Sequence, residues 1–177
     1  MAVLKPLARW FGYVPGTGFA VWAVNAVFQR ILRIDADCPY GKHFSTRILH
    51  ARGLTIEDDC SYVRRSLAVS GGCYLNAADG LWIGKGTIWS ANVAIISQDH
   101  AIDDFREAPA TGGIRIGRGC WIGFGAVILP GVVLGDYTVV GANADVTRSF
   151  EQGRVVIAGA PASVVRQLDG LPRHIGQ

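Results

Sequence analysis

A period of six residues runs through the second half of the chain and constrains its fold more than any other feature. From Ile116 to Glu151 there are six consecutive hexapeptides, and each opens with Ile, Leu or Val. Three more units in the same phase start at Ile83, and a looser set starts at Ile56. An amphipathic helix needs apolar residues at spacings of three and four, and a half-buried strand needs strict alternation, so neither fits. The period predicts an all-β solenoid in which three short strands make one triangular coil and the coils stack as parallel strands.

Each place in the unit has its own expected role. The opening aliphatic residue points into the prism, and the fifth place is small or modest in size, as at Cys120, Ala126 and Ala144. Gly follows the opening residue in four of the six units from Ile116. We expect these second-place glycines to adopt turn conformations that side chains resist.

The remaining segments are organised around this repeat. We expect an N-terminal extension over residues 1–52 with a helix at 19–33, the β-helix over 53–168, and a tail at 169–177. The prism ends at Gly159-Ala160-Pro161, after which a short helix is expected over Ala162–Leu168. The largest break, Ala101–Arg115, predicts a loop that protrudes from the prism. This loop gathers charge in a chain that has little of it, at Asp103, Asp104, Arg106 and Glu107.

Composition excludes several classes of function. The net charge of +3 is modest and the basic residues are scattered, which argues against a nucleic-acid groove. The four cysteines show no metal-ligand spacing, so we expect reduced core residues, no metal and a cytoplasmic protein. The apolar segment 19–34 is shorter than the roughly 20 residues that span a bilayer. Packing over the prism or against a neighbouring subunit is favoured for it, and weak association with a membrane surface is the open alternative.

The string IISQDHAIDDF at residues 95–105, set among hexapeptides over residues 53–168, resembles the hexapeptide-repeat acyltransferases, in particular the galactoside and maltose O-acetyltransferases. The resemblance implies a left-handed parallel β-helix, a homotrimer with sites at subunit boundaries, and acetyl-CoA as donor. It also implies transfer to a hydroxyl of a sugar or polysaccharide precursor. His100 matches the catalytic histidine, and Asn76 in CYLNAADG matches an active-site asparagine when a short gap is allowed.

The same resemblance supplies the residues of the donor groove. Trp121 matches a tryptophan near the active site, and Arg166 in AGAPASVVRQL matches a basic residue that meets the phosphate end of the donor. Ser163 departs from the pattern, because relatives often carry a second Arg or Lys there. Further matches along the groove are Phe124, Ala142, Thr147 and Arg148.

The implied chemistry is direct transfer. A sugar hydroxyl is a poor nucleophile at neutral pH, and an imidazole can take its proton as the oxygen attacks the thioester carbonyl. The proton can then pass to the departing thiolate, so no acyl-enzyme intermediate is needed.

Two other functions remain open. A γ-type carbonic anhydrase shares this fold but needs a zinc ion held by three histidines. The chain has four, and of these only His100 lies within the clear repeats. A non-catalytic scaffold is the other alternative, and acetyl-CoA turnover would separate it from a transferase. Among the transferases, serine acetyltransferase is disfavoured because the long helical N-terminal domain of that family is missing.

Overall fold

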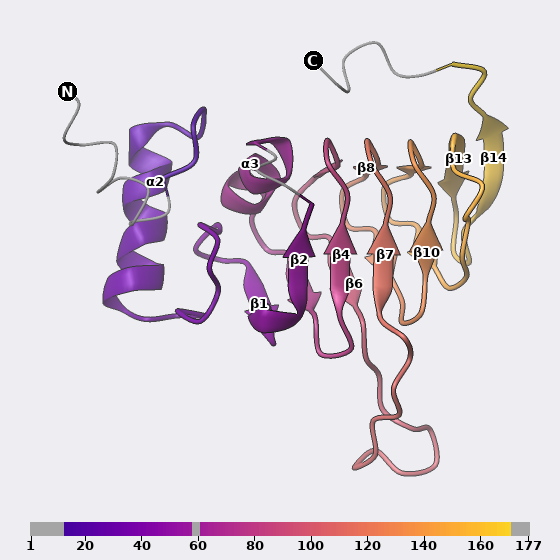
Figure 1. The fold of residues 1–177 in the computed structure, drawn as a ribbon, viewed down its shortest axis with the longest axis horizontal. Helices are drawn as coiled ribbons and strands as arrows, with labels where there is room; N and C mark the ends of the chain where they lie inside the picture. Colours follow the sequence, from indigo (N-terminus) through magenta and orange to yellow (C-terminus); the bar gives the residue numbers. More distant parts are fainter. Residues whose placement is uncertain (1–12, 58–60, 171–177) are drawn as a thin grey trace.

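Three sheets of short strands form the sides of a stack of coils in the computed structural model, which describes residues 13–57 and 61–170 (Figure 1). All strand pairs in these sheets are parallel except the last pair in sheet C. Sheet A contains β1 (Arg47–Leu49), β3 (Tyr74–Asn76), β6 (Ala94–Ile96), β9 (Val127–Ile128) and β12 (Asp145–Val146). Sheet B contains β2 (Leu54–Ile56), β4 (Leu81–Ile83), β7 (Ile114–Ile116) and β10 (Val133–Leu134). Sheet C contains β5 (Ile88–Trp89), β8 (Trp121–Ile122), β11 (Val139–Val140), β13 (Val155–Ala158) and β14 (Ser163–Gln167).

The chain visits the three sheets in turn, so strands one coil apart are hydrogen-bonded neighbours. Ile95 lies opposite both Leu75 and Ile128, and Ile122 lies opposite Val140. The opening residues of the six clear units are all buried and form the core of the prism: Ile116, Ile122, Ile128, Leu134, Val140 and Val146. The fifth-place residues are buried as well, from Cys120 to Phe150. The predicted orientation of the repeat is therefore confirmed.

Glycine is required at the second place for a reason other than the turn conformation that we predicted. None of the five (Gly84, Gly117, Gly123, Gly135 and Gly141) has a positive φ. At Gly117 an added Cβ would lie 2.6 Å from the backbone nitrogen of Asp136, one coil further on, so contact between coils demands glycine. A positive φ occurs instead at the fourth place of the unit. This place holds glycine in some units and another residue in others, such as Tyr137 (φ 61°) and Asn143 (φ 54°).

The first coil departs from the predicted units. Helix α3 (Ser61–Val69) replaces a strand of sheet C and packs beside β5, where the Ser70 hydroxyl donates to the Trp89 carbonyl over 2.8 Å. Tyr74 opens a hexapeptide of the looser set, but the side chain that points inward is that of Leu75, which lies opposite Ile95. The stack also begins earlier than residue 53, at β1. Local helical patterning in 61–69 outweighs the weak hexapeptide signal that we assigned there.

The predicted short helix over Ala162–Leu168 is wrong. Ser163–Gln167 forms β14, which pairs antiparallel with β13 and closes the far end of sheet C. Five exposed residues in a row carry no apolar stripe for a helix, whereas the free edge of β13 offers unpaired backbone groups.

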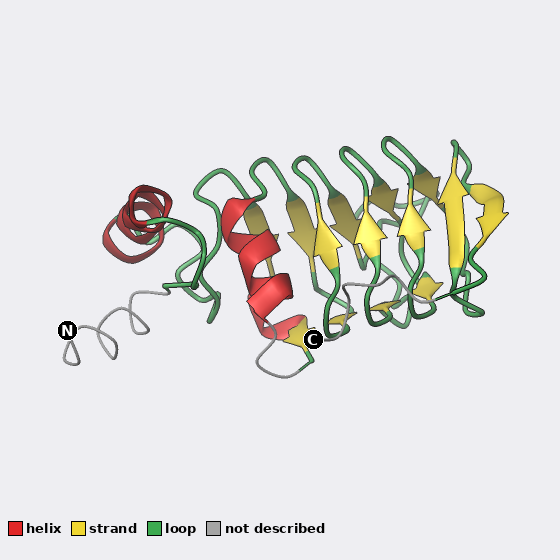
Figure 2. Cartoon of the chain, turned by 90° about the horizontal axis from the view of Figure 1, so that it is seen from above, coloured by secondary structure: helices red, strands yellow, loops and turns green. Residues whose placement is uncertain are grey.

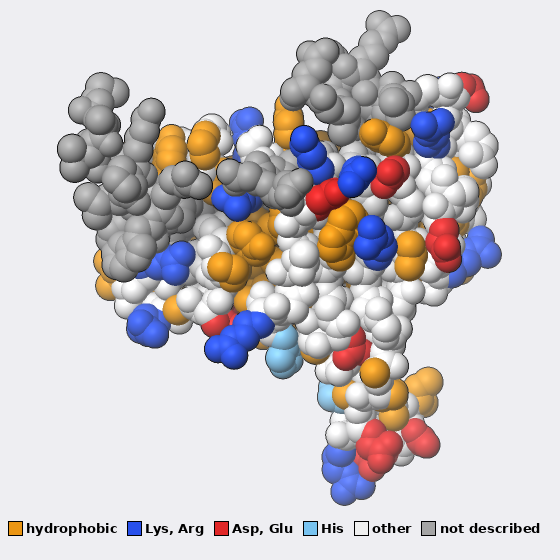
Figure 3. All heavy atoms as spheres, viewed as in Figure 1, with side chains coloured by type: hydrophobic (Ala, Val, Ile, Leu, Met, Phe, Trp, Pro, Cys, Tyr) orange, Lys and Arg blue, Asp and Glu red, His pale blue; other side chains and the backbone are white. Residues whose placement is uncertain are grey.

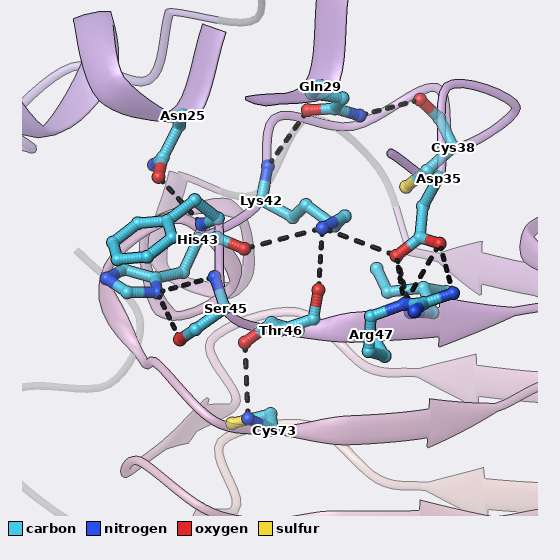
Figure 4. A network of polar contacts seen from close by, with 12 residues as sticks. Asn25, Gln29, Asp35, Cys38, Lys42, His43, Ser45, Thr46, Arg47 and Cys73 are labelled. Atoms are coloured by element: carbon cyan, nitrogen blue, oxygen red, sulfur yellow. Dashed lines mark hydrogen bonds and ion pairs between the residues drawn. The ribbon is translucent and has the colours of Figure 1, made fainter. Parts of the chain in front are cut away.

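The N-terminal helix lies across the opposite end of the stack (Figure 2). It comprises α2 (Phe19–Ala26) and continues as a π-helical turn, η1 (Val27–Ile31), ending two residues before the predicted boundary. Its polar side chains face inward (Figure 4). Asn25 donates to the Ala68 carbonyl of α3 over 3.0 Å and accepts from the Phe44 amide over 2.9 Å. Gln29 donates to the carbonyls of Cys38 and Tyr40.

A buried ion pair connects this helix to the first coil. Lys42 is 1% exposed, and its Nζ lies 3.3 Å from the Asp35 carboxylate and 2.6 Å from the Thr46 carbonyl. Arg47 of β1 binds the same carboxylate, and the Lys42 amide lies 3.4 Å from the Gln29 side-chain oxygen. Every polar group named here has a partner, as burial requires. The short 3-10 helix η2 (Ala51–Gly53) then turns the chain from β1 into β2.

Cys38, Cys73 and Cys120 are free thiols buried in the core. Burial raises the pKa of the Cys38 and Cys120 thiols to about 11, which keeps both protonated and unreactive. Within residues 13–57 and 61–170, no helix has the length and apolar character needed to cross a membrane.

We expect Gly117→Ala to lower the free energy of unfolding by about 3 kcal/mol, because the new methyl group would meet fixed backbone of the next coil. Asn143→Gly is the matched control, since it changes a fourth-place corner residue without adding atoms, and its effect should stay within about 0.5 kcal/mol. Denaturant titration of both variants measures the difference. Equal stabilities would contradict the proposed contact between coils.

Candidate active site at the corner between sheets A and B

The chain passes from sheet A to sheet B at one edge of the prism, which we call the A/B corner. The residues between these two sheets that exceed the six-residue period lie at this corner. From Ile128 to Leu134 the inward residues are six positions apart, but from Ile48 to Ile56 and from Leu75 to Ile83 they are eight apart. Between β6 and β7 the chain leaves the prism altogether over residues 97–113, the corner loop (Figure 1). The predicted protruding loop is therefore present, and Ile114 and Arg115 belong to β7.

One carboxylate holds both ends of the corner loop. Asp79 lies at the same corner one coil earlier, and its Oδ1 accepts a hydrogen bond from Gln98 Nε2 over 2.9 Å. Its Oδ2 accepts from the Thr111 amide over 2.7 Å and lies 3.1 Å from the Thr111 hydroxyl. That hydroxyl lies 2.5 Å from the Ser97 carbonyl, and the Ser97 hydroxyl accepts from the Asp79 amide. These bonds, which we call the Asp79 clamp, fix where the loop leaves and rejoins the prism.

Sequence reasoning missed Asp79. The signal was the change of phase at residues 79–81, where a charged residue stands in the break one coil before the loop.

The outer part of the loop has structure of its own. Arg106 and Asp104 form a two-point ion pair at 2.9 and 2.7 Å, and the Ala101 amide donates to the Glu107 carbonyl over 2.9 Å. Charged side chains gather on the projecting loop (Figure 3). Between them, Ile102 is 94% exposed and Phe105 is 75% exposed. Such apolar side chains at the end of a projection suit contact with another surface.

His100 lies at the base of this loop, four residues after the end of β6, and its side chain is exposed. Its amide donates to Asp99 Oδ1 over 2.8 Å. Asp99 is also exposed.

Asn76 ends β3 at the same corner, one coil before His100. It is half-buried and lies opposite Ile96, and its carbonyl accepts from the Ser97 amide over 3.0 Å. Its side-chain oxygen accepts from the Ala78 amide over 3.0 Å. The structure therefore places His100 and Asn76 on adjacent coils of one corner.

The residues assigned to the donor are spread over the molecule. Thr147 and Arg148 follow β12 at the A/B corner, two coils beyond the loop. Phe124 and Ala142 lie in turns between sheets C and A, the C/A corner, and belong to successive coils, with the Asn143 amide donating to the Phe124 carbonyl. Trp121 is 51% exposed on sheet C, and Arg166 is exposed on β14 of the same sheet. One chain does not bring the C/A corner residues together with His100.

A concave region lies on the outer side of sheet B, with a volume of about 690 Å³. Arg115 stacks over Trp82 at 3.9 Å, and Arg118 forms an ion pair with Glu57 of the first coil. The hydrogen bond from Arg118 lowers the pKa of the Glu57 carboxyl to about 2. Arg118 and Glu57 therefore neutralise each other in this region, and Arg115 is engaged with the Trp82 ring. Its residues were not predicted from the sequence.

Within the part of the chain that the structure describes, no group of three or more His, Cys, Asp and Glu side chains is placed to hold a metal ion.

Comparison with known proteins gives this geometry its context. A sequence model of the bacterial transferase hexapeptide, with six repeats, matches residues 113–147. The chain resembles the hexapeptide-repeat acetyltransferases.

Two curated relatives illustrate this resemblance. A protein of Dictyostelium discoideum named "Putative acetyltransferase" is 49% identical over 89 residues, which are 49% of this chain and 46% of that protein. The "Putative colanic acid biosynthesis acetyltransferase" of Escherichia coli strain K12 is 34% identical over 121 residues, which are 59% of this chain and 65% of that protein. The chain thus spans about half the length of the first and less than two thirds of the second.

Among solved structures, a galactoside acetyltransferase in complex with coenzyme A superposes with a TM-score of 0.58 at 21% identity. The match covers 88% of this chain and 82% of that one. At this identity the likeness concerns the fold. The hexapeptide-repeat acetyltransferase fold implies a left-handed coil.

We expect Asp79→Ala to release the corner loop, because three contacts to the carboxylate disappear together. Hydrogen exchange of the Thr111 amide should accelerate by about tenfold or more, since that amide donates to Asp79. Asp79→Asn should preserve most of the protection, because one amide oxygen can still accept from Thr111 while Gln98 reorients. Asp103→Ala removes a loop charge outside the clamp and is the control. Unchanged exchange in Asp79→Ala would show that the clamp does not hold the loop.

Proposed function

We propose that the chain is an acetyl-CoA-dependent O-acetyltransferase that acts on a hydroxyl of a sugar or polysaccharide precursor. The observation that carries this proposal is the exposed imidazole of His100 at the base of a clamped loop, on a fold shared with acetyltransferases. The relative named for colanic acid biosynthesis supports a carbohydrate acceptor. The galactoside acetyltransferase bound to coenzyme A supports the donor.

In this mechanism His100 is the general base. Its imidazole takes the proton of the acceptor hydroxyl while that oxygen attacks the thioester carbonyl. The tetrahedral intermediate then collapses, the carbon–sulfur bond breaks, and the imidazolium returns the proton to the departing thiolate. Asn76 can assist, because its side-chain oxygen is held by the Ala78 amide and its NH₂ group is left to meet the acceptor or the developing oxyanion.

The donor residues support a site that is shared between copies of the chain. His100 and Asn76 lie at the A/B corner, whereas Phe124 and Ala142 lie at the C/A corner, at the other end of sheet A. Closed rotation of identical subunits can bring the C/A corner of one against the A/B corner of the next. We therefore propose a homotrimer in which the apolar end of the corner loop, at Ile102 and Phe105, reaches the neighbouring subunit. Arg166, Arg148 and Thr147 would meet the phosphate-bearing part of the donor, with Trp121 nearer the acyl group.

We expect His100→Ala and His100→Asn to lower turnover by about 10²–10⁴-fold, the usual contribution of a positioned general base. His50→Asn is the matched control, since His50 is also exposed and has a positive φ that Asn tolerates. Acetyl-CoA turnover against a panel of sugars, nucleotide sugars and lipid-linked oligosaccharides measures the effect. Near wild-type turnover in either variant contradicts the proposed mechanism.

The shared site predicts complementation between two inactive variants. His100→Ala removes the base at one corner, and Ala142→Glu places a charge at the other corner, in the proposed donor groove. When the two variants are unfolded, mixed in equal amounts and refolded, random assembly leaves about a quarter of the sites with both corners intact. Activity should recover to about that fraction of wild type, and the particle mass from light scattering should be that of three chains. No recovery in mixed oligomers would place both groups in the same chain.

A further inference from the structure

The outer side of the N-terminal helix carries an exposed apolar surface. Val24, Val27 and Ile31 follow one another at helical spacing, and with Phe19 and Leu32 they make up what we call the outer apolar face. Their exposed fractions run from 42% at Val27 to 74% at Phe19. The helix that carries this face lies at the end of the stack opposite β14 (Figures 1 and 2). A contiguous apolar surface of this kind marks an interaction site.

The opposite side of the same helix carries two buried polar side chains that are hydrogen-bonded. Asn25 and Gln29 are 6% and 3% exposed, and both bond to backbone groups of the following segment and of α3 (Figure 4). A helix packed on a core normally turns its apolar stripe inward. Here the inward contacts fix the reverse orientation, so the outer apolar face is a determined feature of the fold.

The sequence up to residue 34 carries charge of one sign only. Residues 1–34 contain Lys5, Arg9, Arg30 and Arg33 and no acidic residue, whereas residues 35–177 contain thirteen basic and fourteen acidic residues. The whole net positive charge of the chain therefore resides in its first 34 residues. The next acidic residue, Asp35, is buried and paired with Lys42 and Arg47.

The helix is short, and aromatic rings gather at its start. Together α2 and η1 run from Phe19 to Ile31, too short to cross a bilayer but long enough to lie in its surface. Trp22 contacts Tyr13 edge-on at 6.0 Å and Phe19 at 5.3 Å. Aromatic side chains of this kind favour the boundary between lipid headgroups and acyl chains.

We propose that the outer apolar face docks on an anionic lipid surface, with Phe19, Val24 and Ile31 entering the headgroup boundary and the exposed Arg33 meeting lipid phosphates. The distribution of charge favours lipid over a second copy of the chain, because a symmetric contact between two such faces would bring like charges together. This proposal does not rest on the proposed function.

The test uses the full chain and vesicles of two compositions, phosphatidylcholine alone and phosphatidylcholine with about one third phosphatidylglycerol. The wild-type protein should co-sediment with the anionic vesicles, and high salt should weaken the binding. Ile31→Glu should lower the partition coefficient by about tenfold or more, because a charge replaces an apolar anchor. Arg33→Asn should lower it less, and Asn tolerates the positive φ of 59° at that position.

Val165→Glu is the matched control, because Val165 is 60% exposed on β14 at the far end of the molecule, compared with 69% for Ile31. Binding of Val165→Glu should equal that of wild type. The proposal fails if wild-type protein does not co-sediment with anionic vesicles, if it binds neutral and anionic vesicles equally, or if the two Glu variants behave alike. A smaller particle mass for Ile31→Glu without any wild-type vesicle binding would assign the face to contact between subunits.

Discussion

The fold depends on how closely the backbones of successive coils approach. Where glycine stands at the second place of the hexapeptide there is no room for a Cβ atom, as Gly117 and Gly123 show, each with backbone of the next coil within 2.6 Å of the position it would take. This contact sets how closely successive coils approach where those glycines stand. Leu129 stands at the second place where the chain turns from sheet A to sheet B. The core then needs only one aliphatic side chain per unit, because stacking places those side chains in three continuous columns. Insertions are tolerated only where a corner can expand without separating the coils.

The A/B corner is where the stack expands, and this explains the position of the candidate base. A long loop that leaves a rigid edge would otherwise give its first residues little fixed structure. Asp79 prevents this by joining Gln98 and Thr111 from the two ends of the loop to the preceding coil. His100 therefore stands two residues beyond a fixed point, while Asn76 is held by strand pairing to the adjacent coil. The site combines the rigidity of the solenoid with the reach of a loop, which is the arrangement a general base needs.

Features with a strict period could be predicted from the sequence, and features set by long-range contacts could not. The inward column from Ile116 to Val146 follows directly from the repeat, as does the loop that interrupts it. Helix α3 was missed because Ser66 falls in the fifth, small-residue place of the looser hexapeptide set that starts at Ile56. Strand β14 was missed because an exposed segment takes its structure from the edge beside it. The role of Asp79 could not be predicted either, since its partners Gln98 and Thr111 are 19 and 32 residues away. For the candidate site, His100 and Asn76 do lie at one corner, and their catalytic roles stay predictions.

The N-terminal helix shows why the direction of amphipathicity matters. Turning Asn25 and Gln29 inward instead of Val24 and Ile31 forgoes apolar burial and requires a partner for each buried polar atom. Those partners exist because the segment after the helix, through Lys42 and Asp35, folds back beneath it. Folding of the isolated chain gains nothing from leaving Ile31 and Phe19 in water, and the same polar network holds both side chains there. The polar network within the chain fixes the orientation of α2, and the proposed contact with an anionic lipid surface would bury the apolar side chains that this orientation leaves in water.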